Sequence, residues 1–118
     1  MEKEKKILKF LIKKLKYTSE DSIYKTKNKE EYFIYYHPLL EENSYSIHLL
    51  LKENKNYILS LIKQDTNLTG STLYSFENFD DKTLNEIDKV YCSLKEKLNS
   101  SEEKYRKKLE DLISKHNF

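Results

Sequence analysis

The sequence predicts an α+β fold with an N-terminal helix, a four- to five-stranded and mainly antiparallel sheet, and a long C-terminal helix. Apolar residues recur at helical spacing at both ends of the chain, and between them β-forming residues alternate with a period of two. The length of 118 residues and the hydrophobic content of 37% suit one domain with one core. We therefore expect a single domain over residues 1–118, with a helix over 1–17, the sheet over 22–76 and a second helix over 81–116.

The N-terminal segment is expected to form an amphipathic helix. Its apolar face consists of Ile7, Leu8, Leu11, Ile12 and Leu15. Lysines follow the opposite face, as in a helix that covers a sheet while its lysines reach solvent. The alternatives are a phosphate-binding arm and a helix on a membrane surface. Lys14 interrupts the apolar face, which argues against both, and the lack of Trp argues further against the membrane.

Five strands are predicted between the helices, over residues 23–27, 31–36, 45–51, 56–63 and 72–76. Pro38 holds His37 extended and ends the second strand. Residues 53–56 suit a tight hairpin loop, and Gly70 interrupts the polar stretch before the last strand.

The C-terminal helix has two start signals. Asp80 can cap a helix that begins at Asp81, and Phe79 can pack on Leu84 as a hydrophobic staple. An apolar stripe then follows at helical spacing through Leu84, Ile87, Tyr91, Leu94 and Leu98.

Two sequence rules disagree at residues 99–101. The Asn-Ser-Ser sequence followed by Glu103 has the form of a helix stop and a new capping box. However, an apolar or aromatic residue recurs every seven positions through this point, at Leu84, Tyr91, Leu98, Tyr105 and Leu112. We favour one continuous helix, with a kink or break near Asn99 as the alternative. At 1.5 Å per residue such a helix is roughly 50 Å long, so its distal half must overhang so small a domain.

The composition limits what the charges can mean. The chain has a net charge of +2, but residues 1–29 hold ten lysines against four acidic residues, so a polyanion would meet the N-terminal region first. Ala and Trp are absent and Arg106 is the single arginine, which is typical of an AT-rich coding sequence. The many lysines therefore carry less functional information than usual.

Several function classes are excluded or disfavoured. One glycine cannot make a phosphate-binding loop or dinucleotide fingerprint, and one cysteine cannot make a thiolate zinc site or an internal disulfide. His37, His48 and His116 lack the spacing of a metal site, and we interpret His48 as a hydrogen-bonded structural residue and Cys92 as inert. We expect no catalytic, cofactor or metal site, no small-molecule substrate, no membrane span and a cytoplasmic location.

The favoured function is a non-enzymatic protein-interaction module, such as an inhibitor or adaptor of the kind that phages and plasmids of AT-rich hosts encode. It would bind a larger protein or a second copy of itself. The candidate contact residues lie in the distal half of the C-terminal helix and are Tyr105, Leu109, Leu112 and Ile113.

The alternative is a nucleic-acid-binding protein, in which lysines meet phosphates and bases stack on tyrosines. Its candidate residues are Lys5, Lys6, Lys9, Lys13, Lys25, Lys27, Tyr32 and Tyr35. The strand motifs of ribonucleoprotein domains are absent, and tyrosines in strands are more often core residues with solvated hydroxyls.

Overall fold

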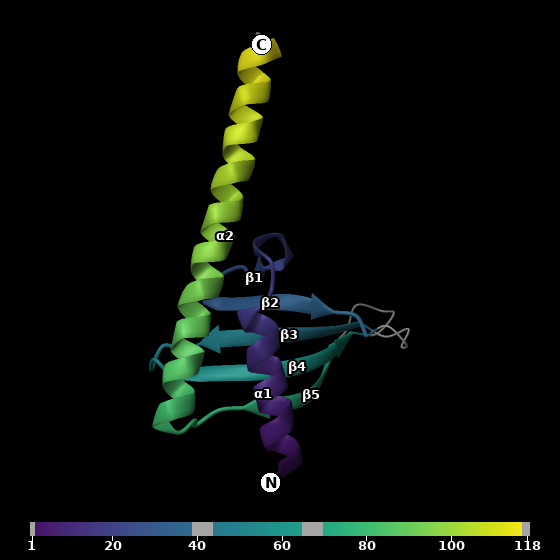
Figure 1. Cartoon of the computed structure of the whole chain (residues 1–118), viewed down its shortest axis with the longest axis vertical. Coiled ribbons are helices and arrows are strands. Elements are labelled where there is room, and N and C mark those ends of the chain that lie inside the picture. Colours follow the sequence, from purple (N-terminus) through teal and green to yellow (C-terminus); the bar gives the residue numbers. More distant parts are fainter. Residues whose placement is uncertain (1, 39–43, 65–69, 117–118) are drawn as a thin grey trace.

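The computed structural model describes residues 2–38, 44–64 and 70–116 of the protein. These residues form an antiparallel sheet with two helices on one of its faces, α1 (Glu2–Lys16) and α2 (Asp81–His116), as Figure 1 shows. The predicted order of helix, sheet and helix is confirmed. Both helices follow their predicted ranges closely.

The sheet is a meander in which each strand pairs with its neighbour in the sequence, in the order β1-β2-β3-β4-β5. The strands are β1 (Tyr24–Lys25), β2 (Glu31–Tyr36), β3 (Ser44–Leu51), β4 (Tyr57–Gln64) and β5 (Gly70–Phe76). The hairpin at residues 53–56 is confirmed, since the Lys52 amide donates to the Asn56 carbonyl and Lys55 adopts a φ of 65°.

Two details of the sheet differ from the prediction. β1 is shorter than residues 23–27, because a 3-10 turn over Glu20–Ser22 precedes it and Asn28 turns the chain toward β2 with a φ of 65°. Gly70 begins β5 instead of preceding it. A Cβ atom at Gly70 would lie 2.7 Å from Cγ2 of Ile62, so the close approach of the two strands explains the glycine.

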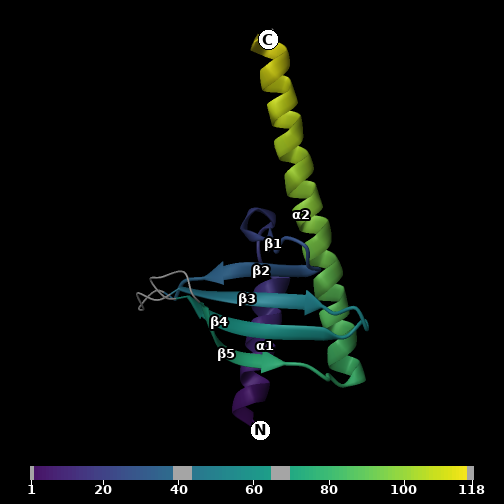
Figure 2. The same ribbon diagram turned by 180° about the vertical axis from the view of Figure 1, so that it is seen from behind.

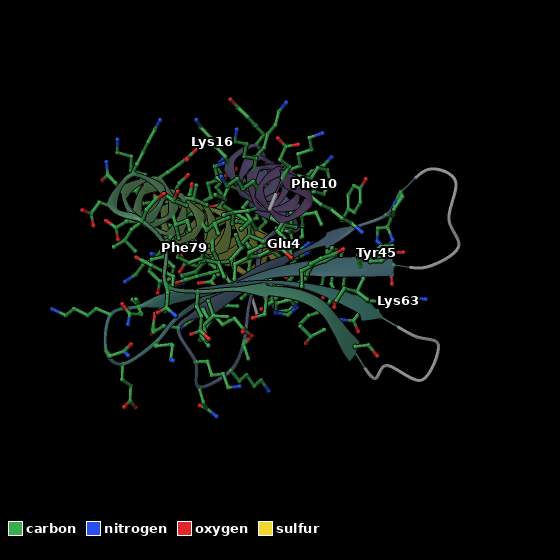
Figure 3. All side chains as sticks on the ribbon, turned by 90° about the horizontal axis from the view of Figure 1, so that it is seen from below. Glu4, Phe10, Lys16, Tyr45, Lys63 and Phe79 are labelled. Atoms are coloured by element: carbon green, nitrogen blue, oxygen red, sulfur yellow. The ribbon has the colours of Figure 1, made fainter. Side chains whose placement is uncertain are left out.

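α1 docks on the sheet through its predicted apolar face. Leu11, Ile12 and Leu15 are buried, and Ile7 and Leu8 pack against the same core. Figure 3 shows α1 and α2 on the same side of the sheet. The core between the layers also contains Tyr32, Ile34, Ile47, Leu49, Tyr57, Leu59, Ile87 and Leu94.

Lys14 occupies the apolar side of α1 for a specific reason. Its ammonium nitrogen lies 4.9 Å from the centre of the Tyr36 ring and 5.6 Å from that of Phe10. A cation over aromatic faces is stabilised electrostatically, which offsets the position of a charge beside apolar groups.

α2 begins as predicted and is not interrupted at residues 99–101. The Thr83 amide donates to Asp80 Oδ1 at 2.8 Å, which confirms the cap, and this bond holds the pKa of Asp80 below its usual range. The helix continues through these residues, so the capping box that Ser100 and Glu103 could form is not used, and the neighbouring Ser101 hydroxyl donates to Asp21 Oδ1 at 3.2 Å. The favoured continuous helix is therefore confirmed.

Neither helix covers the second face of the sheet, which Figure 2 shows from behind. Tyr24, Phe33 and His48 lie at paired positions of β1, β2 and β3 on this face. Phe33 stacks on the Tyr24 ring at 5.5 Å and on the His48 ring at 4.7 Å. An aromatic row thus crosses the open face.

Candidate functional site

The distal half of α2 extends beyond the sheet and carries an exposed apolar stripe. Every residue from Glu102 to His116 is exposed, and Figure 1 shows this segment projecting past β1. Tyr105 keeps 70% of its surface in solvent, and about half remains for Leu109, Leu112 and Ile113. All four predicted contact residues are therefore accessible.

The stripe is the continuation of the buried face of the same helix. Tyr91 is buried and Leu98 partly buried, and Tyr105 and Leu112 follow at intervals of seven residues. Seven residues are close to two helical turns, so these side chains lie on the same side of α2. The stripe therefore lies beyond the β1 edge of the sheet, next to the 3-10 turn at Glu20–Ser22.

Polar contacts fix the point at which α2 leaves the rest of the chain. Lys97 Nζ donates to the carbonyl oxygens of Lys16 and Thr18, at 3.2 and 3.0 Å. About two turns further, Lys104 Nζ donates to Glu20 Oε1 at 2.6 Å, which lowers the pKa of Glu20 and raises that of Lys104. We call the part beyond these contacts, residues 105–116, the overhang.

Charged residues border the two edges of the stripe. At 100° per residue, Lys108 and Lys115 fall on one edge, whereas Arg106 and Glu110 lie together on the other. A partner helix that packs along the stripe is favoured if it is acidic beside the two lysines. Two antiparallel copies of the overhang would instead bring each edge against the same edge of the other copy.

A buried polar network lies on the open face of the sheet. Gln64 Nε2 donates to Ser46 Oγ at 2.9 Å, so the Ser46 hydroxyl can donate to His48 Nε2, 2.8 Å away. His48 Nδ1 lies 3.4 Å from Glu31 Oε1 and makes no hydrogen bond within the described chain. Burial lowers the pKa of His48, against the opposing effect of the Glu31 carboxylate.

This network has the order of a serine–histidine–carboxylate triad but not the access that catalysis needs. Ser46 has no exposed surface, and Gln64 occupies an acceptor site on its hydroxyl oxygen. A nucleophile must reach the reacting carbon of a substrate. The geometry therefore supports a structural role for His48, in line with the sequence interpretation.

The structure separates the candidate residues of the nucleic-acid alternative. Tyr32 is 3% exposed in the core, whereas Tyr35 is 47% exposed at the opposite face of β2. Tyr32 is therefore unable to stack on a base, and the alternation of side chains along a strand is the signal that predicts this. The candidate lysines of α1 belong to a helix that covers the opposite face of the sheet from Tyr35. Lys13 nevertheless lines a groove together with Tyr35. Lys25 lies 3.7 Å from the Glu30 carboxylate, and Lys27 is exposed.

The groove shared by Lys13 and Tyr35 was not predicted. It lies between the C-terminal end of α1 and the outer edge of β2, and it has a volume of about 550 Å³. Tyr17 and Lys14 also line it. The sequence does not predict a joint site for these two residues. They come near Tyr35 because β1 is short and leaves part of the outer edge of β2 uncovered.

No group of side chains in the described ranges could hold a metal ion, and no described helix has an apolar stretch long enough to cross a bilayer. Cys92 is a free, exposed thiol. Comparisons with models of protein families, with curated proteins and with solved structures found no significant match.

Proposed function

We propose that the protein is a non-enzymatic interaction module that binds another protein through the overhang of α2. The observation that carries this proposal is the exposed stripe of Tyr105, Leu109, Leu112 and Ile113 on a helix that extends past its own domain. The overhang, residues 105–116, is short, and an isolated helix of about 12 residues is only marginally stable in water. Contact with a partner would therefore stabilise the overhang.

The stripe offers enough apolar surface for an anchor. Complete burial of a Leu or Ile side chain stabilises by about 1.5 to 3 kcal/mol, and these side chains are half-exposed, so each would contribute about 1 kcal/mol. Helices that bind in grooves use anchors at this three- and four-residue spacing. The edge charges favour a different protein over an antiparallel second copy.

The cytoplasmic setting expected from the sequence belongs to this proposal, since a free thiol such as Cys92 stays reduced there. The protein would act as an inhibitor if the overhang occupies a functional surface of its partner, and as an adaptor if it bridges the partner to another protein.

The test compares three forms of the full-length, tagged chain in extracts of its native host. Leu109→Glu places a charge in the centre of the stripe, and Lys107→Glu places the same charge on the opposite side of α2. We expect a specific protein to be recovered with the wild type and with Lys107→Glu but not with Leu109→Glu. Equal recovery in all three forms would contradict the proposal, and sedimentation velocity would show whether the recovered partner is a second copy.

A further inference from the structure

The groove beside β2 exists because the edge of this strand is covered for only part of its length. β1 pairs with Tyr32 and Phe33 and then ends, so no described strand covers the outer edge of β2 from Ile34 to Tyr36. Because backbone groups of a strand point alternately to its two edges, the amide and carbonyl of Tyr35 face the groove.

The lining of the groove is aromatic and basic. The cations are Lys13 and Lys14, and rings come from Phe10, Tyr17, Tyr35, Tyr36 and His37. None of the described lining residues is acidic. The acidic residues that follow α1 contact α2, since Glu20 pairs with Lys104 and Asp21 accepts a hydrogen bond from Ser101. The groove therefore favours an anion.

The exposed rings indicate a ligand that carries several aromatic groups. Tyr17 is 71% exposed at one side of the groove, and Tyr35 at the other side stacks on the His37 ring at 6.4 Å. Tyr35 also contacts the rings of Tyr24 and Phe33 at 5.4 and 5.7 Å, so the aromatic surface continues from the groove onto the open face of the sheet. A run of rings fits successive bases better than it fits one.

A second hollow in the structure lacks this chemistry. It lies at the β3–β4 hairpin and has a volume of about 700 Å³. Its lining includes Glu30 and Glu53 with two lysines, and no aromatic ring. The size of a hollow is therefore not the reason for choosing the β2 groove as a binding site. The reason is that its lining combines lysines and aromatic rings and contains no carboxylate.

We propose that the groove between α1 and the outer edge of β2 binds single-stranded nucleic acid, with bases stacked on Tyr17 and Tyr35 and phosphates paired with Lys13 and Lys14. Figure 3 shows Phe10, which also lines the groove, on the side of α1 that faces away from α2. The site is separate from the overhang of α2, so it stands or falls independently of the proposed protein-binding function.

The test measures binding of a short fluorescein-labelled oligothymidylate to the full-length protein by fluorescence anisotropy over a series of salt concentrations. Two variants act on exposed lining residues and leave the core intact: Tyr17→Ala, and the double substitution Lys13→Gln with Lys14→Gln. The matched control for the tyrosine is Tyr105→Ala on the overhang. The matched control for the lysines is the double substitution Lys82→Gln with Lys89→Gln, near the N-terminal end of α2 and outside the groove. Thermal melting confirms that each variant is folded.

We expect Tyr17→Ala to weaken binding about tenfold, within the range for loss of one stacked base. The double lysine variant should reduce the slope of log affinity against log salt by about 1.4, since each phosphate neutralised on a single strand contributes about 0.7. Both controls should bind like the wild type. An abasic strand of the same length should bind more weakly, because it keeps the phosphates and lacks the rings.

Four results would overturn the assignment, and the first three concern binding, its specificity for the groove and its dependence on bases. One is no measurable binding of the oligonucleotide at low salt, and another is equal loss of binding in the groove variants and in their controls. The third is competition by polyglutamate or by the abasic strand as effective as that of the intact strand, which would assign the groove to acidic polymers in general. Thymidine monophosphate as a competitor tests the chain requirement: competition equal to that of the strand would reassign the groove to single nucleotides.

Discussion

Tyr57 and Asp88 join the sheet to the long helix, since the Tyr57 hydroxyl donates to Asp88 Oδ1 at 2.5 Å. Tyr91, three residues further along α2, donates in the same way to Glu30 Oε2 at 2.9 Å. Burial and these carboxylate partners raise the pKa of both phenols. Two tyrosine hydrogen bonds thus hold the proximal half of α2 against one end of the sheet, where the β1–β2 and β3–β4 turns lie side by side.

The Tyr57–Asp88 bond should contribute measurably to stability. Tyr57→Phe keeps the ring and removes the donor, and we expect the free energy of unfolding to fall by about 1 to 2 kcal/mol. Urea denaturation measures this change. Tyr105→Phe removes the same hydroxyl from an exposed ring and should change stability by less than about 0.5 kcal/mol. Equal effects of the two substitutions would show that the Tyr57 bond is not stabilising.

The docking of α1 gives a second prediction. Leu11 is completely buried between α1 and the sheet, so Leu11→Ala should lower the free energy of unfolding by about 2 to 5 kcal/mol. Lys9→Ala on the exposed side of the same helix should change it by less than about 0.5 kcal/mol. Chemical denaturation of both variants measures these changes. If Leu11→Ala leaves the free energy of unfolding almost unchanged, α1 is not docked on the sheet in solution.

Protonation of His48 should destabilise the fold. Its pKa is lowered by burial, so the folded state binds a proton less readily than the unfolded state does, and stability is full above the unfolded pKa of about 6.5. We expect the free energy of unfolding to fall as the pH drops below about 6.5, by at most about 1.4 kcal/mol per pH unit. Urea denaturation at a series of pH values measures the slope.

The control for this effect uses His37, which directly follows the end of β2. His48→Gln should remove the slope between about pH 6.5 and 5, whereas His37→Gln, at an exposed position, should keep it. The carboxylates with lowered pKa, Glu20, Glu30 and Asp80, act in a lower pH range and do not interfere. The same slope in wild type and His48→Gln would refute the assignment.

Much of this fold follows from local sequence rules. The period of hydrophobic residues locates both helices and the five strands, and the cap at Asp80 marks the start of α2 to the residue. These features depend on neighbours in the chain, and a single sequence contains that information. The continuity of α2 is also local, since its seven-residue spacing outweighs the stop signal at residues 99–101.

The candidate sites depend on contacts that local rules do not reach. Lys14 looked like a defect in the apolar face of α1, and its explanation lies in the ring of Tyr36 from β2. The β2 groove requires the late start of β1, which follows the 3-10 turn before Ile23 and pairs only with Tyr32 and Phe33. Both features depend on which residues the folded sheet brings together, and the local pattern of residues does not contain that information.

The last prediction concerns where α2 stops belonging to the domain. Truncation after Lys104 removes the exposed overhang and keeps the contacts of Lys97, Ser101 and Lys104 with the segment that follows α1. We expect this form to remain folded, with a free energy of unfolding within about 1 kcal/mol of the full chain, because exposed residues contribute little to stability. Truncation after Leu98 also removes the Ser101 and Lys104 contacts, which are exposed, so the further loss of stability should be small. Urea denaturation compares the three forms, and both truncated forms should lose the partner that the full chain recovers. If removal of the overhang alone unfolds the protein, the stripe of Tyr105 and Leu112 stabilises the domain itself, and the partner surface must lie elsewhere.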